Sequence, residues 1–66
     1  RNEVYKQKAI TLMRLNEYQK AIDELNLYRS NLESMEDSQL KMNELEWTNI
    51  MLYKAGKMKD LGLTKN

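Results

Sequence analysis

The sequence predicts an all-α fold, an antiparallel helical hairpin followed by a third helix, and three observations support this prediction. Proline is absent, and the two glycines, Gly56 and Gly62, both lie late in the chain. Leucine, lysine, glutamate and methionine, which favour helix, are frequent. Apolar residues recur at intervals of three and four in three separate segments, which is the spacing of one helix face. We therefore expect one small helical domain over residues 1–66 and, since the chain begins with Arg1, a fragment of a longer protein.

The first helix is predicted over residues 2–15. Its apolar stripe consists of Tyr5, Ala9, Leu12 and Met13. Asn16 is expected to end this helix, because asparagine tolerates the left-handed backbone conformation that a tight helix end requires.

The second helix is predicted over residues 17–34, with the cleanest amphipathic stripe in the chain. The stripe consists of Tyr18, Ala21, Ile22, Leu25, Tyr28 and Leu32. Only about two residues separate this helix from the first, so the two must lie antiparallel and adjacent. The small side chain of Ala21 is expected to face the first helix at the point of closest approach.

The third helix is predicted over residues 38–61, with Asp37 or Ser38 capping its first turn. One face carries Leu40, Trp47, Ile50, Met51 and Ala55, joined by Met58 and Leu61 if the helix continues through Gly56. A second face carries Met42, Leu45, Leu52 and Tyr53. A helix that is apolar on two sides usually lies between two neighbours. The second face is therefore predicted to contact protein beyond these three helices.

These stripes together predict the hydrophobic core of the domain. Its expected members are Tyr5, Ala9, Leu12, Tyr18, Ala21, Ile22, Leu25, Tyr28, Leu32, Leu40, Trp47 and Met51.

The composition excludes several classes of site. Without cysteine or histidine the chain can form no disulfide and no thiolate or imidazole zinc site. There is no glycine-rich phosphate loop, and the serines have no histidine base. We therefore expect no enzymatic activity and no cofactor or metal, and the lack of cysteine favours a cytoplasmic location. No segment has the roughly 20 apolar residues of a membrane span.

The net charge of +1 is too small to indicate nucleic-acid binding by itself, but the charges are unevenly distributed. Residues 33–46 are acidic, through Glu33, Glu36, Asp37, Glu44 and Glu46. Residues 54–66 are basic, through Lys54, Lys57, Lys59 and Lys65. We interpret both as solvated helix faces. A nucleic-acid-binding domain, the less favoured alternative, would require these lysines to line up with the basic first helix.

The spacing of aromatic and small residues in the hairpin resembles the tetratricopeptide repeat, a helix pair of about 34 residues. The matching positions are Tyr5, Ala9, Leu12, Asn16, Tyr18, Ala21 and Leu25. Lys8, Tyr28 and Glu33 depart from the family pattern, and a degenerate second copy is marked by Gly56, Met58 and Leu61. The resemblance implies a non-enzymatic scaffold that binds protein or peptide, or the rest of its own repeat array.

A three-helix chain with "NEY..A" in its second helix and "AGKMKDL" at the end of its third also resembles the microtubule-interacting and trafficking domain. That resemblance implies a groove between helices that binds a partner helix in membrane trafficking. The helices here are shorter than is usual in that family, so we treat it as the alternative.

The predicted partner-binding residues are the second face of the third helix together with two apolar residues that lie off their own stripes. They are Met42, Leu45, Leu52, Tyr53, Ile10 and Leu27. Leaving so many large apolar side chains in water is unfavourable. The isolated chain is therefore expected to self-associate, or to be only marginally folded, until this surface is covered.

Overall fold

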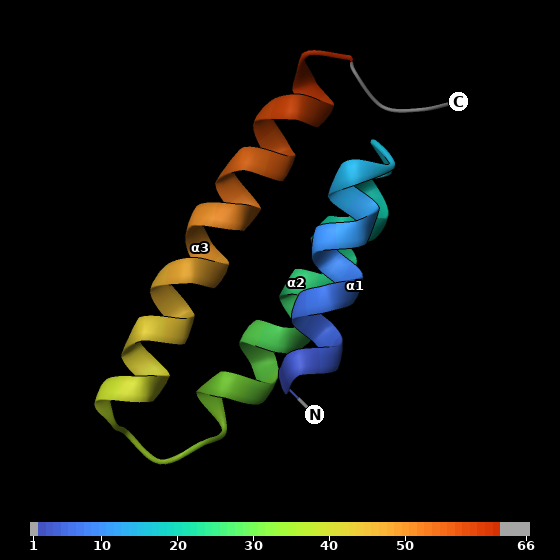
Figure 1. Cartoon of the computed structure of the whole chain (residues 1–66). Helices are drawn as coiled ribbons and strands as arrows, with labels where there is room; N and C mark the ends of the chain where they lie inside the picture. The colour runs from blue at the N-terminus through green and yellow to red at the C-terminus, as the bar shows by residue number, and fades with distance from the viewer. Residues whose placement is uncertain (1, 63–66) are drawn as a thin grey trace.

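The computed structural model describes residues 2–62, and every regular element in that range is an α-helix. The helices are α1 (Asn2–Arg14), α2 (Tyr18–Glu33) and α3 (Gln39–Asp60). They alternate in direction, and α2 packs against both α1 and α3 (Figure 1). The predicted all-α fold is confirmed, and the expected helix ends differ from the observed ones by at most one residue.

The turn between α1 and α2 depends on the backbone conformation of Asn16. This residue has a φ of 60°, in the left-handed region, as its sequence position predicted. The Asn16 amide donates to the Met13 carbonyl at 3.1 Å, and the Glu17 amide donates to the Leu12 carbonyl at 2.9 Å. This pair of bonds is the Schellman arrangement, which satisfies carbonyls at the helix end. The chain therefore reverses within three residues, Leu15 to Glu17, and brings α2 back alongside α1.

The connection from α2 to α3 is held by the side chain of Lys41. Its Nζ donates to the Met35 carbonyl at 2.9 Å and pairs with Asp37 Oδ1 at 3.0 Å. Of the two predicted caps, Asp37 and Ser38, the structure has Ser38, whose Oγ accepts from the Lys41 amide at 3.1 Å. The helix then continues without interruption through Gly56 to Asp60, so the open question of its length is resolved in favour of the longer helix.

The core follows one side of α2 and the residues packed on it. Its fully buried members are Ala9, Tyr18, Ala21, Leu25, Tyr28, Leu32, Thr48 and Ala55. Ala9 and Ala21 are both 0% exposed, consistent with a close approach of α1 and α2. Other predicted core residues are half-buried: Tyr5, Leu12, Ile22, Trp47 and Met51.

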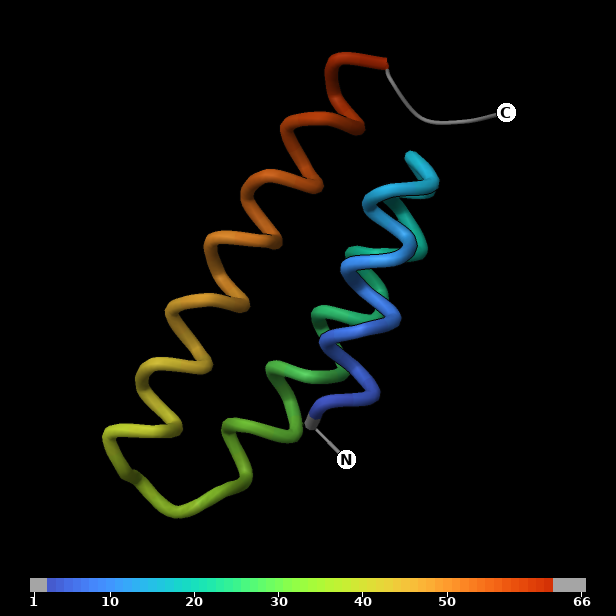
Figure 2. Tube along the Cα trace, viewed as in Figure 1, coloured from blue at the N-terminus to red at the C-terminus, as the bar shows by residue number. Residues whose placement is uncertain are grey.

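The prediction that Leu40 belongs to the core is wrong, because its side chain is 62% exposed. Leu40 lies two turns, or about 10 Å, before Trp47 on the same face of α3. Trp47 contacts Lys6, which is near the start of α1. α1 begins at Asn2, only about one turn before Lys6, so it does not extend far enough to cover Leu40. The tube in Figure 2 shows the start of α3 joined to the end of α2 by the connecting segment.

Candidate functional site

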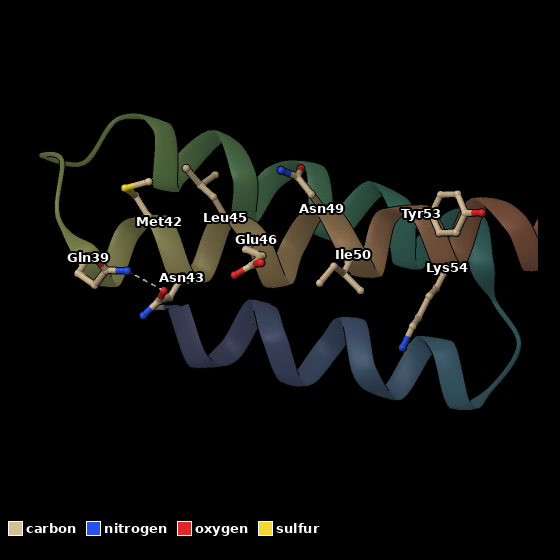
Figure 3. A pocket seen from close by; sticks show the side chains of 9 residues that line it. All are labelled: Gln39, Met42, Asn43, Leu45, Glu46, Asn49, Ile50, Tyr53 and Lys54. Carbon is tan, nitrogen blue, oxygen red and sulfur yellow. Dashed lines mark hydrogen bonds between the residues drawn. The ribbon is translucent and has the colours of Figure 1, made fainter.

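The outward side of α3 carries a shallow groove whose walls come from that helix alone (Figure 3). Its lining residues are Gln39, Met42, Asn43, Leu45, Glu46, Asn49, Ile50, Tyr53 and Lys54, and we call this set the outer face. The residues recur at intervals of three and four, so they form one continuous stripe along the helix. Because the opposite side of α3 packs on α2, this stripe is the side left for a partner.

The large side chains of the outer face are unusually exposed for apolar residues. Tyr53 is 68% exposed, Met42 65% and Ile50 48%, whereas Leu45 is half-buried. Three of the predicted partner-binding residues, Met42, Leu45 and Tyr53, thus lie together. Ile50 joins them, although the sequence had placed it on the face of Trp47. Contiguous exposed apolar residues of this kind mark interaction surfaces.

The other three predicted partner-binding residues lie elsewhere. Leu52 is half-buried and shares the side of α3 that carries the buried residues Thr48 and Ala55. Ile10 is half-buried on α1, one turn beyond Lys6. Leu27 is 54% exposed on the far side of α2. The structure therefore does not combine all six predicted residues in one surface.

Beneath the outer face, a polar cluster fixes α3 against the hairpin. The Tyr28 hydroxyl of α2 donates to Glu44 Oε1 of α3 at 2.5 Å, and Lys6 Nζ of α1 lies 3.0 Å from the same oxygen. Lys6 also lies 4.9 Å from the centroid of the Trp47 ring. The Tyr28 ring packs edge-on against Trp47, with 6.3 Å between centroids. One carboxylate thus joins all three helices.

The surroundings of this cluster shift the pKa values of its two acids in opposite directions. Burial, followed by the hydrogen bond to Glu44, raises the pKa of the Tyr28 hydroxyl. The hydrogen bond from Tyr28 lowers the pKa of the Glu44 carboxyl, and Lys6 lowers it further, while burial acts in the other direction. At neutral pH the cluster therefore holds a neutral phenol against a charged carboxylate. This cluster was not identified from the sequence, since it depends on which turns of α1 and α3 face each other.

Thr48 is a second feature that the sequence reasoning missed. It is fully buried, and its hydroxyl donates to the Glu44 carbonyl at 2.7 Å, so burial leaves no polar atom unpaired. Thr48 and Ala55 are small residues seven apart on the side of α3 that packs on α2. Small residues at this spacing are the sequence pattern that could have predicted the contact between α3 and α2.

The charged segments predicted from the sequence do not form compact sites in the described residues. Asp37 of the acidic segment pairs with Lys41, and no group of three or more acidic side chains in residues 2–62 is arranged to hold a metal ion. Of the basic residues, Lys59 turns back to donate to Gln19 of α2, while Lys57 lies 5.9 Å from the centroid of the Tyr53 ring. Lys65 lies outside the described residues.

A smaller apolar hollow lies between the C-terminal halves of α1 and α3. Met13 comes from α1, and its other lining residues, Tyr53, Lys54, Lys57 and Met58, come from α3. Tyr53 and Lys54 also line the groove of the outer face, so the two depressions adjoin.

No helix in residues 2–62 combines the length and apolar character needed to cross a membrane. Comparison of the chain with protein families, curated proteins and solved structures found no match.

Proposed function

We propose that this chain is a non-enzymatic protein-binding module of the tetratricopeptide type, which presents the outer face of α3 to an amphipathic helix of a protein partner. The observation that supports this most directly is the exposure of Met42, Ile50 and Tyr53 on one stripe. Burying a side chain of this size contributes roughly 1.5–3 kcal/mol, so covering the stripe would favour association. The opposite side of α3 already packs on α2, and at the edge of the stripe Asn49 Oδ1 accepts a hydrogen bond from Arg29 of α2 at 3.2 Å.

The repeat-type assignment is supported by details of the hairpin. The turn at Asn16 and the complete burial of Ala9 and Ala21 are features on which the resemblance depends. Tyr18 is 3% exposed, and its hydroxyl donates to Asn16 Oδ1 at 2.7 Å, so the second aromatic position fixes the turn. A helix is a suitable occupant of the outer face, because residues three and four apart form ridges that a second helix can pack against.

A selection from a display library of amphipathic helical peptides tests this function. We expect enriched peptides with apolar residues spaced at three and four, whose binding is lost with Tyr53→Ser. Leu27→Ser is the matched control, since Leu27 is 54% exposed on α2 and lies outside the groove. Peptides that bind both variants equally, or no enrichment at all, would contradict the proposal.

The alternative, a domain of the microtubule-interacting and trafficking type, is favoured by the hollow between α1 and α3. In that case the partner helix would lie in the hollow. Met13→Asp would then abolish binding while Met42→Asp would not, because Met13 lines the hollow and Met42 does not. Loss of binding with Met42→Asp but not with Met13→Asp supports docking on the outer face. Titrations with duplex and single-stranded DNA at two salt concentrations test the nucleic-acid alternative, which predicts tight and steeply salt-dependent binding.

A further inference from the structure

We propose that the helix which docks on the outer face is α3 of a second copy of this chain, antiparallel to the first about a two-fold axis at Ile50. This inference rests on the proposed function, because it names the partner of the same face. It is carried by the order of charges and apolar residues along α3.

A row of residues four apart follows α3 across the outer face and into the adjoining hollow. The row is Met42, Glu46, Ile50, Lys54 and Met58. It therefore alternates apolar, acidic, apolar, basic and apolar. Residues four apart form a ridge on a helix, and the ridge of one helix packs beside the ridge of another.

The row is complementary to itself when one copy is reversed. A two-fold interface brings the same patch together on both chains, so each contact occurs twice. With the axis at Ile50, Glu46 lies opposite Lys54 of the second copy, since both are one turn from Ile50 in opposite directions. The two Ile50 side chains then meet at the axis.

A parallel arrangement in the same register fails this test. It would place Glu46 against Glu46 and Lys54 against Lys54, which are like-charge contacts that disfavour association. The charge pattern thus selects the antiparallel orientation, and the apolar residues contribute the affinity. Exposed ion pairs contribute little affinity by themselves but fix register.

The two charges that this arrangement uses are available in the described chain. Glu46 and Lys54 are both exposed. The ion pairs among residues 2–62 are Lys6–Glu44, Lys8–Glu24, Lys20–Glu17 and Lys41–Asp37, so neither of the two is paired there. Figure 3 shows the Glu46, Ile50 and Lys54 side chains projecting from the same side of α3.

The first experiment is disulfide trapping with a single introduced cysteine, which is unambiguous because the chain has none of its own. Ile50→Cys lies at the proposed axis, so the two cysteines approach each other and should form a covalent dimer rapidly under mild oxidation. Leu27→Cys is the control, with a similar exposed fraction, 54% against 48%, on a different helix. Trapping of Ile50→Cys no faster than Leu27→Cys overturns the proposal.

The second experiment is a charge exchange followed by sedimentation from low micromolar to millimolar concentration. Glu46→Lys and Lys54→Glu should each weaken dimerisation about tenfold or more, and the double variant should restore it. Circular dichroism checks that each variant remains helical. A dimer whose affinity is unchanged by the single exchanges overturns the inference, as does a double variant that fails to recover dimerisation.

A chain that stays monomeric yet captures displayed helices through Tyr53 overturns the second-copy inference and leaves the proposed function standing. A chain that stays monomeric and also enriches no helical peptide from the display library contradicts the proposed function itself.

Discussion

Lys6 of α1 and Glu44 of α3 form an ion pair of 3.0 Å, although the two helices are separated in the chain by the whole of α2. The side chains of Lys6 and Glu44 are only 24% and 20% exposed. The same Glu44 oxygen accepts the Tyr28 hydroxyl, so one carboxylate joins α3 to both other helices. Since the outer face belongs to α3, this carboxylate contributes to how that face is presented.

Glu44 should make the fold sensitive to acid. Its pKa is lowered in the folded chain, chiefly by the hydrogen bond from Tyr28 and then by Lys6, from an ordinary value of 4.5. The unfolded chain therefore binds its proton first as the pH falls, so the stabilisation is complete above about 4.5 and is lost as the pH drops through the folded pKa. We expect Glu44→Gln to lower the free energy of unfolding by about 1 kcal/mol at neutral pH.

Urea unfolding of both proteins over a pH series checks this prediction. The difference between wild type and Glu44→Gln should shrink in acid. A difference that stays constant from neutral pH to well below 4.5 would show that the folded pKa of Glu44 is ordinary.

Ala21→Leu should destabilise the hairpin by roughly 1–3 kcal/mol, because added methylenes overpack a site that is 0% exposed. Lys20→Leu is the neighbouring control, since Lys20 is exposed on the same helix. Thermal unfolding followed by circular dichroism measures both. Equal midpoints for Ala21→Leu and the wild type would mean that α1 and α2 do not approach closely at this residue.

Asn16→Ala should lower the free energy of unfolding by about 1–2 kcal/mol. Residue 16 adopts the left-handed conformation, in which the Cβ of alanine is sterically unfavourable. Asn16→Gly removes the steric penalty and loses only the bond from Tyr18, so it should cost less than Asn16→Ala. Chemical denaturation ranks the three proteins. Both variants lose the bond from Tyr18, so a glycine variant less stable than the alanine variant would show that the left-handed conformation at residue 16 carries no steric penalty.

Gly56→Ala should stabilise α3 by roughly 0.5–1 kcal/mol, since glycine inside a helix carries an entropic penalty. A Cβ atom at residue 56 would have no neighbouring atom within 4 Å, so nothing opposes the gain. Gly62→Ala is the contrasting variant, because Gly62 has a φ of 74° and alanine there is strained. A fall in the midpoint of thermal unfolding for Gly56→Ala would contradict the described helix at this position.

Local features of the fold were predictable from the sequence for physical reasons. Apolar spacing located the three helices, and the tolerance of asparagine for left-handed backbone located the turn at Asn16. Periodicity gives the direction of a side chain around its own helix, but not how far the neighbouring helix extends. This is why the apolar spacing predicts Leu40 in the core, although α1 does not extend far enough to cover it.

The candidate site was predictable only in part, because α3 is apolar around more than half of its circumference. Periodicity identified two apolar faces but could not say where the boundary between them would fall once α2 was packed. Ile50 therefore lies on the outer face, and Leu52 lies toward α2. The cluster around Glu44 requires the relative height of α1 and α3, which no local pattern contains.

The packing of each helix mainly against its neighbour in the chain has a consequence for the speed of folding. With α1 on α2 and α2 on α3, most contacts join segments close in sequence, and such low contact order is typical of chains that fold in microseconds to milliseconds. The Lys6–Glu44 pair closes the longest loop among the ion pairs of the described residues, so we expect it to form after the two hairpins. Temperature-jump kinetics should then show Glu44→Gln accelerating unfolding while leaving the folding rate nearly unchanged.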